Sequence, residues 1–193
     1  LYHYGGIYID MDVLCLKNMK KLLELFSDAD FIVSYLPLSK TEIFSVNKLN
    51  KIIRRKKAIK VDKMINNGII LCKKKSKIIK IIMDKIKENF YTKYKKMFRD
   101  VYIFNTTGPI IFSDIINNYQ GKDNVKVIDS KYMEPCTVLM KKCDLTKSFF
   151  KLEHQRTWGT NKLEYIISII KFYNKYKIII YLIILFLIHK YLF

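Results

Sequence analysis

The stretch "YHYGGIYIDMDV", residues 2–13, holds two carboxylates, Asp10 and Asp12, with one residue between them. A β-strand points residues i and i+2 to the same face, so a strand over residues 7–16 projects both side chains together. Paired carboxylates repel each other and lose solvation, and a divalent cation relieves both effects. Mg²⁺ and Mn²⁺ prefer oxygen ligands and commonly hold substrate phosphates as well. The stretch therefore predicts a metal and diphosphate site at the C-terminal end of a buried strand.

The spacing alone is weak evidence, because the chain contains it twice. Asp28 and Asp30 in "SDADF" have the same spacing, but they precede an apolar run and lack a preceding glycine pair. We expect this second pair to lie in a solvated loop or at a helix end. Before the first pair, Gly5 and Gly6 allow a tight turn or a close backbone approach. The setting, more than the spacing, distinguishes the first pair.

The elements that must position these residues follow an alternating pattern. Strands are predicted at residues 7–16, 30–36, 66–74 and 124–129, and helices at 17–26, 76–90 and 106–119. Residues 38–61 are polar and basic and indicate an excursion or a helical insert, and residues 148–160 indicate a short strand or loop. Strands that alternate with helices are typical of an α/β fold with a largely parallel sheet.

The C-terminal tail differs in composition from the rest of the chain. Residues 178–188 form an uninterrupted run of 11 apolar residues, and lysines and tyrosines precede it. The run is shorter than the roughly 20 residues of a spanning helix, but it is apolar on all sides. We expect one domain over residues 1–160, a basic juxtamembrane linker or helix over 161–177 and a membrane-associated tail over 178–193. The protein is then membrane-associated through this tail.

Charge and cysteine content add limits. The 193 residues carry 36 Lys plus Arg against 17 Asp plus Glu, a formal charge of +19. Such a charge suits an anionic partner such as nucleic acid, a membrane surface or a phosphorylated substrate. The bias toward Ile, Lys, Asn and Tyr also follows from AT-rich coding sequence, and lysines spread through nearly every segment argue against one nucleic-acid-binding face. No two of the four cysteines have zinc or thioredoxin spacing, and nothing demands a disulfide. A reducing compartment is therefore favoured.

"YHYGGIYIDMDV" resembles the signature of glycosyltransferases with a DxD-containing sugar-binding region. This group includes fungal initiating mannosyltransferases, mannosyl-inositolphosphorylceramide synthases and bacterial capsular enzymes. The resemblance implies an A-type glycosyltransferase fold, which is a Rossmann-like mixed sheet with helices. It also implies a nucleotide-sugar donor, Mn²⁺ or Mg²⁺, a glycan, lipid or protein acceptor, and transfer with retention of anomeric configuration. It covers residues 1–160. Family members carry a considerable segment before this motif, so we expect the N-terminal part of the fold to be absent here, with a C-terminal apolar helix added.

The resemblance also assigns site residues. "INNGIILC" is similar to the family's Asn-containing turn and strand, "TGP" at 107–109 to a helix start, and "HQRTW" at 154–158 to a His-containing segment that ends in Ser-Trp. The metal ligands implied are Asp10, Asp12 and His154. The donor-binding residues implied are Gly5, Gly6, Tyr8, Asp10, Asn66, Asn67, Thr157 and Trp158. A turn formed by two Asn and a Gly, and a structural His and Trp, are the simpler alternatives.

Two other functions stay open at this point. The first is a non-catalytic, membrane-tethered remnant that keeps the fold and has lost the nucleotide pocket. The second is a basic nucleic-acid-binding module, suggested by the net charge and by "RRKK" at 54–57. The departure of a nucleoside diphosphate is assisted by groups that neutralise its charge, and the reaction needs little general-base catalysis. We therefore nominate no catalytic nucleophile.

Overall fold

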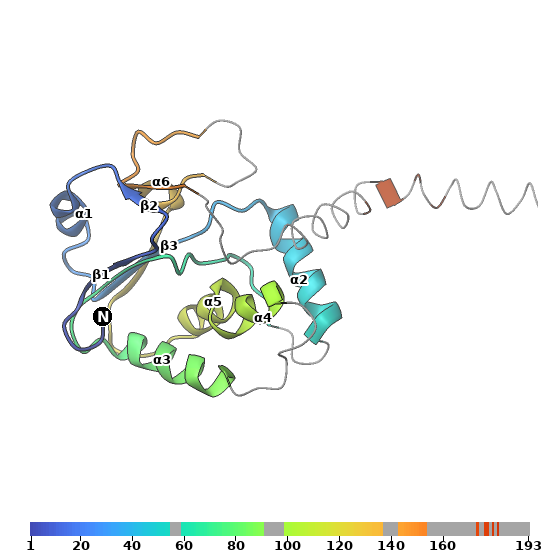
Figure 1. Ribbon diagram of the computed structural model, residues 1–193, viewed down its shortest axis with the longest axis horizontal. Helices are drawn as coiled ribbons and strands as arrows, with labels where there is room; N and C mark the ends of the chain where they lie inside the picture. The colour runs from blue at the N-terminus through green and yellow to red at the C-terminus, as the bar shows by residue number, and fades with distance from the viewer. Residues whose placement is uncertain are drawn as a thin grey trace, which may run out of the picture.

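The computed structural model describes residues 1–54, 59–90, 99–136 and 143–153, together with residues 173, 176, 177, 179 and 181 (Figure 1). The strands are β1 (Gly6–Ile9), β2 (Val13–Cys15), β3 (Phe31–Ser34), β4 (Ile69–Cys72), β5 (Val125–Ile128) and β6 (Phe150–Leu152). The helices are α1 (Met19–Leu25), α2 (Lys40–Arg54), α3 (Lys77–Phe90), α4 (Arg99–Thr106), α5 (Pro109–Asn117) and α6 (Ser130–Met133).

A four-stranded mixed sheet has the order β1-β4-β3-β5, and β2 pairs with β6 in a separate two-stranded sheet. The predicted α/β class with a mixed sheet is confirmed. The expectation of a largely parallel sheet is wrong, because only β3 and β5 run parallel while β4 is antiparallel to both neighbours. The chain leaves the C-terminal end of β3, passes through α2 and returns to the same end of β3, so β4 begins there and runs antiparallel to β3. A bridge between Tyr35 and Ile65 marks that return.

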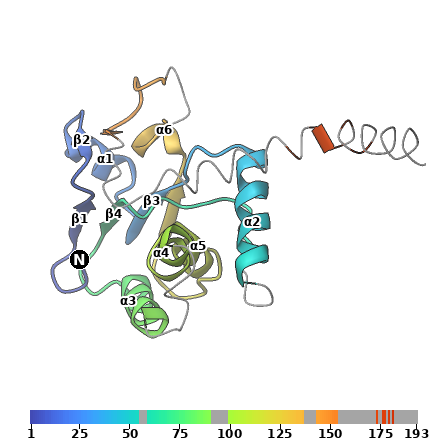
Figure 2. The same cartoon turned by 45° about the vertical axis from the view of Figure 1, so that its right-hand side comes forward.

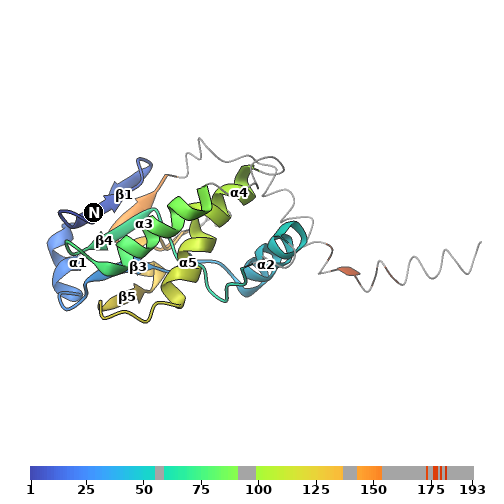
Figure 3. The same cartoon turned by 90° about the horizontal axis from the view of Figure 1, so that it is seen from below.

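The central strands β3 and β4 are buried because both faces of the sheet are covered. The helices α3 and α5 lie over one face (Figure 3), and α1 and α6 lie on the other side of the sheet (Figure 1). On one face, Phe31 and Ile70 pack against α3 and α5. On the other face, Ile32 and Leu71 pack against α1, α6 and the β2–β6 pair. The short apolar runs therefore fit strands that are covered twice, as their sequences predict.

The strand β1 differs from these central strands. It lies at the edge of the described sheet, and Ile7, Tyr8 and Ile9 are 38%, 45% and 37% exposed. The prediction of a buried strand before the first aspartate pair is therefore wrong. An apolar run is compatible with either position, because β-propensity favours such residues in edge strands as well.

The basic insert is the helix α2, as one of the two expectations had it. Figure 2 shows α2 beside α4 and α5. Ile43 of α2 packs with Val61, Met64 and Ile110 in a third apolar cluster. The insert therefore has its own small core and is anchored to the domain by it.

Two helix starts follow different rules. Gly108 caps α5 and Pro109 occupies its first turn, as the sequence predicts. At the start of α3, the Asp123 carboxylate accepts from the Ile78 backbone N–H and from the Ser76 hydroxyl. The cap of α3 therefore comes from a residue 45 positions away and not from Ser76 itself.

The predicted tail lies almost wholly outside the described residues. Of residues 178–193, the structure describes only Ile179 and Tyr181, both in helical conformation. Among the described residues, no helix has the length and apolar character needed to cross a membrane.

Cys136 and Cys143 form a disulfide with their Cα atoms 5.5 Å apart. The sequence contained no signal for this pairing, so the inference that nothing demands a disulfide is corrected. The apolar runs around Cys15 and Cys72 predict that both thiols are buried; this is confirmed for Cys72 and wrong for Cys15, which is exposed. The disulfide closes a short loop directly after α6.

Candidate functional site

Asp10 and Asp12 lie in the turn between β1 and β2, and not within one continuous strand as predicted. The ladder with β4 ends at the pair of Ile9 with Ile69, because the chain before β4 turns there. The Asp10 N–H donates to the Gly68 carbonyl at 2.8 Å and the Glu153 N–H donates to the Asp12 carbonyl at 2.8 Å. The backbone of both aspartates is therefore fixed from two sides.

The Asp10 carboxylate is half-buried, and burial is the main reason why its pKa is raised. The Tyr8 hydroxyl donates to Asp10 Oδ1 at 2.7 Å, which lowers the pKa of Asp10, while the charge of Asp12 raises it. The same hydrogen bond raises the pKa of Tyr8 to about 12. Within the described ranges, neither aspartate forms an ion pair with Lys, Arg or His. This pair carries negative charge that the described part of the protein does not neutralise.

Behind Asp10 lies a buried polar group made of Asn66, Gly68 and Glu134. Asn66 Oδ1 accepts from the Gly68 N–H at 2.7 Å, and Asn66 Nδ2 donates to Glu134 Oε2 at 2.5 Å. A Cβ at Gly68 would lie 2.7 Å from Asp10 Oδ2, so the absent side chain leaves the space that the carboxylate occupies. The structure thus brings Asn66, a predicted donor-binding residue, next to the aspartates.

The other predicted donor-binding residues before Asp10 have different positions. Tyr8 lies beside Asp10, as described. Gly5 and Gly6 lie at the opposite end of β1, where their φ angles are +73° and +110°. A Cβ at Gly5 would be 2.7 Å from the Lys74 backbone nitrogen. The positive φ angles and the close backbone approach therefore explain why glycine occupies these two positions. A role of Gly5 and Gly6 in donor binding stays a prediction.

Asn67 lies beside the start of α5. Its Nδ2 donates to the Thr107 carbonyl at 3.5 Å, so the "NNG" turn and the "TGP" segment are neighbours. His154, Thr157 and Trp158 lie outside the described residues. The chain reaches them through Glu153, the residue whose backbone N–H is bonded to Asp12. Among the described residues, no three His, Cys, Asp or Glu side chains are grouped as a metal site would require.

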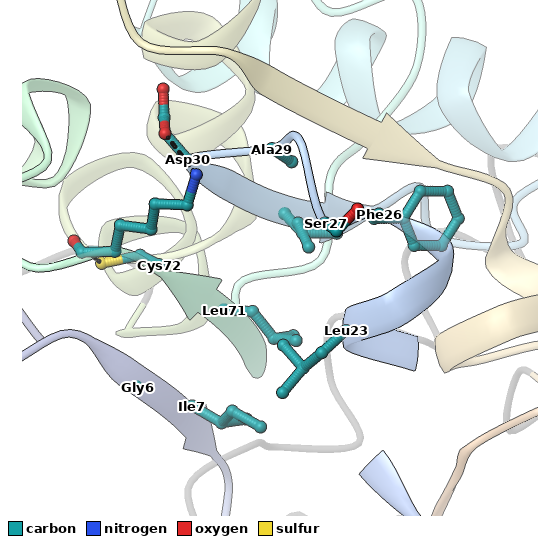
Figure 4. Close-up of a pocket in the computed structure, with 11 residues that line it drawn as sticks. Gly6, Ile7, Leu23, Phe26, Ser27, Ala29, Asp30, Leu71 and Cys72 are labelled. Carbon is teal, nitrogen blue, oxygen red and sulfur yellow. Dashed lines mark hydrogen bonds and ion pairs between the residues drawn. The ribbon is translucent and has the colours of Figure 1, made fainter. Parts of the chain in front are cut away.

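The second aspartate pair precedes β3, as predicted, at the other end of the sheet. It adjoins a cavity of about 340 Å³ whose lining includes Ile7, Leu23, Leu71 and Asp30 (Figure 4). Asp30 Oδ1 accepts from Lys73 Nζ at 2.9 Å, at the edge of this cavity. The lining is otherwise mostly apolar, which gives no basis for binding a charged diphosphate.

Comparison with known proteins gives a match for the first part of the chain. Residues 1–34 match the model of a family described as the glycosyltransferase sugar-binding region containing a DXD motif. The match covers 34 of the 193 residues and so concerns the N-terminal segment of the chain. The matched residues run from the N-terminus through β1, both aspartate pairs and β3. The turn that carries Asp10 and Asp12 therefore lies within the matched region.

A curated relative is similar over most of the chain. It is an uncharacterised glycosyltransferase of Acanthamoeba polyphaga mimivirus, 28% identical over 183 residues. The alignment covers 92% of this chain and 59% of the viral protein, so the chain spans less than two thirds of that relative. No solved structure matches.

Sequence reasoning missed Glu134. It follows α6 in the segment "YMEPC", where no motif or periodicity marks it, and its partner Asn66 is 68 residues away. The one available signal was its place shortly after the predicted strand at residues 124–129, because α/β sheets gather polar groups at the C-terminal ends of their strands.

Proposed function

We propose that this chain is the DXD-bearing part of a metal-dependent glycosyltransferase that transfers a sugar from a nucleotide-sugar donor to a glycan, lipid or protein. The fold would be of the A type and the transfer would retain anomeric configuration. The observation that carries the proposal is the un-neutralised Asp10–Asp12 turn inside the region that matches the family model.

The residues present fit a divalent cation. Asp10 and Asp12 offer carboxylate oxygens, the ligand type that Mg²⁺ and Mn²⁺ prefer. Gly68 leaves room at Asp10 Oδ2, and the raised pKa of Asp10 indicates a carboxylate that gains from a nearby positive charge. The cation would supply charge neutralisation for the departing diphosphate. His154 is the third ligand that the family resemblance suggests, and it follows Glu153, which is bonded to Asp12.

The chain's own residues would share the remaining work. Tyr8 donates to Asp10 and, with a pKa of about 12, stays protonated at neutral pH, so it orients the carboxylate. Asn67, Thr157 and Trp158 would hold the donor, and the Trp158 indole N–H is suited to a phosphate oxygen. Asn66 already has one donor and one acceptor engaged by the protein, so we assign it a supporting position behind the aspartates.

Hydrolysis of a panel of nucleotide sugars, with and without MnCl₂, tests the proposal. Asp10→Asn and Asp12→Asn should each reduce hydrolysis by about 100-fold or more, because a charged ligand of the neutralising ion is lost. Asp28→Asn is the matched control and should keep the rate. Proton NMR of the released sugar reports whether the first anomer retains the donor's configuration. Equal rates in all three variants would contradict a metal site at the turn.

We also propose that residues 178–193 associate with a membrane. The support is the uninterrupted apolar run with its basic and aromatic flank. Removing residues 178–193 should move the protein from the membrane fraction to the soluble fraction and leave the domain folded, as fractionation and circular dichroism would show. An unfolded truncated protein would identify the tail as part of the core instead.

A further inference from the structure

Glu134 is a buried carboxylate outside the aspartate pair. It is 6% exposed, and Asn66, the residue it accepts from, is also 6% exposed. Burying a carboxylate costs free energy unless hydrogen bonds compensate the lost solvation, so Glu134 needs buried hydrogen-bond donors. One such bond runs from Asn66 Nδ2 to Glu134 Oε2 at 2.5 Å.

Glu134 fixes the orientation of the Asn66 side chain. The two ends of the Asn66 amide have different partners, and Nδ2, which only donates, faces Glu134 Oε2. The opposite side, Oδ1, then faces the Gly68 backbone N–H, which only donates, at 2.7 Å. A third bond, from the Asn66 N–H to the Ser34 carbonyl at 2.8 Å, ties the same residue to the end of β3.

Gly68 passes this constraint to Asp10 in two ways. Its carbonyl accepts from the Asp10 N–H at 2.8 Å, and the Asp10 carboxylate occupies the space next to it, because a Cβ on Gly68 would lie 2.7 Å from Asp10 Oδ2. The path from Glu134 to Asp10 therefore consists of three successive contacts between buried or half-buried groups. Residues that act on a metal ligand through such contacts commonly change metal affinity when replaced.

We propose that Glu134 is a positioning residue of the Asp10–Asp12 site, acting through Asn66 and Gly68. The proposal rests on the function proposed above, because it assigns Glu134 to the same metal-binding turn. Glu134 does not itself touch the cation or the donor in this assignment. Its role is to hold the amide of Asn66 so that Gly68 keeps the Asp10 carboxylate in place.

Amide hydrogen exchange tests this path without any metal. In Glu134→Ala, the amides of Gly68 and Asp10 should exchange about tenfold faster relative to the Val33 amide in the central strand β3, since the Asn66 amide is no longer held. Glu134→Gln should restore the wild-type exchange, because a Gln oxygen can still accept from Asn66 Nδ2. If Glu134→Ala does not fold, Asn66→Ala breaks the same contact and should give the same acceleration at Asp10.

A matched control separates positioning from general stability. Asn50 is 2% exposed and donates to the Ile59 carbonyl at 2.6 Å, in the α2 region. Asn50→Ala should lower stability but leave the exchange of Gly68 and Asp10, relative to Val33, unchanged. Unchanged relative exchange in Glu134→Ala as well would overturn the proposal.

Manganese titration by calorimetry distinguishes this proposal from the function on which it rests. Mn²⁺ affinity should fall about tenfold in Glu134→Ala and be restored in Glu134→Gln. Loss of binding in Asp10→Asn together with full affinity in Glu134→Ala would overturn the positioning role and leave the metal site intact. Without Mn²⁺ binding in the wild type, the metal-dependent function fails and Glu134 loses its assigned role, whatever the exchange data show.

Discussion

The two Asp-x-Asp pairs of this chain have the same spacing and opposite electrostatic surroundings. Asp10 has a raised pKa, mainly because of burial, and no ion pair within the described part of the chain. Asp28 and Asp30 have lowered pKa values. One pair keeps a negative charge available for an external cation, and the other has it neutralised internally.

The groups that stabilise the charge of the second pair come from β5 and from residues directly next to β4 and β5. Lys126 of β5 bonds Asp28 and is the main cause of its lowered pKa. For Asp30, the main cause is the Asn124 backbone N–H, at 2.8 Å from Oδ2, followed by Lys73. The second pair therefore fastens the starts of β3 and β5 together. The comparison teaches that spacing alone does not define a metal site; the surrounding charges decide whether a carboxylate pair binds an ion or holds the fold.

The largest difference between the two aspartate pairs is expected in metal affinity. Asp10→Asn and Asp12→Asn should each weaken Mn²⁺ binding by about 100-fold, because one unit of ligand charge is lost from an un-neutralised site. Asp28→Asn and Asp30→Asn should leave the affinity unchanged. Isothermal titration calorimetry of the four variants measures this directly. Equal affinity across the set would end the distinction between the pairs.

A second prediction concerns the space at Gly68. An Ala Cβ there would lie 2.7 Å from Asp10 Oδ2 and 3.2 Å from Asn66 Oδ1. The nearest atom belongs to a side chain that can turn away, so we expect Gly68→Ala to reduce Mn²⁺ affinity about tenfold and to change stability little. Gly121→Ala, in the loop before β5, is a glycine control that should leave the affinity intact. A tight-binding Gly68→Ala protein would show that this contact does not set the carboxylate position.

A third prediction addresses the structural pair. Asp30→Ala removes the acceptor of the Asn124 N–H and the partner of Lys73, and should lower the free energy of unfolding by about 1 kcal/mol at pH 7. The pKa of Asp30 is lowered in the folded state, so this stabilisation is present above the unfolded pKa, roughly 4, and is lost as the pH falls through the folded value. Urea denaturation should therefore show that the free energy of unfolding of Asp30→Ala is below that of the wild type at pH 7 and that this difference is smaller at pH 3. A deficit that is the same at both pH values would have a non-ionic cause.

The smallest effect is expected for Asp10 in metal-free buffer, with the opposite sign. The pKa of Asp10 is raised in the folded state, so its ionisation destabilises the protein as the pH rises above the unfolded value. Asp10→Asn removes this penalty and should be slightly more stable than the wild type at pH 7, but not at pH 3. Thermal denaturation in EDTA at the two pH values provides the measurement. A variant that is less stable at pH 7 would show that the carboxylate contributes to the fold.

The sequence predicted best those elements whose environment is uniform along their length. The helix α3 places Ile78, Ile79 and Ile82 on one buried face, as their spacing indicates, and β3 is a short apolar run covered on both faces. In both cases the local pattern and the tertiary contacts agree. Such agreement allows the mixed α/β class to be predicted without coordinates.

The sequence failed where partners far along the chain decide the outcome. The sequence predicted that a strand continues through Asp10 and Asp12, whereas β1 ends where its pairing with β4 ends. It called β1 buried, although apolar composition does not reveal which faces other elements cover. It did not connect Asn66 with Glu134, because a buried hydrogen bond across 68 positions leaves no periodic signal.

The Cys136–Cys143 disulfide has a consequence for how the protein must be produced and handled. A cross-link between residues seven positions apart lowers the conformational entropy of the unfolded chain. In the loop-entropy description this stabilises the folded state by roughly 2–3 kcal/mol. Disulfides persist in oxidising compartments and are rare in the reducing cytosol. The loop it closes begins two residues after Glu134. Expression in an oxidising compartment and purification without thiol reductants would keep this covalent link, and with it the backbone that carries the buried carboxylate.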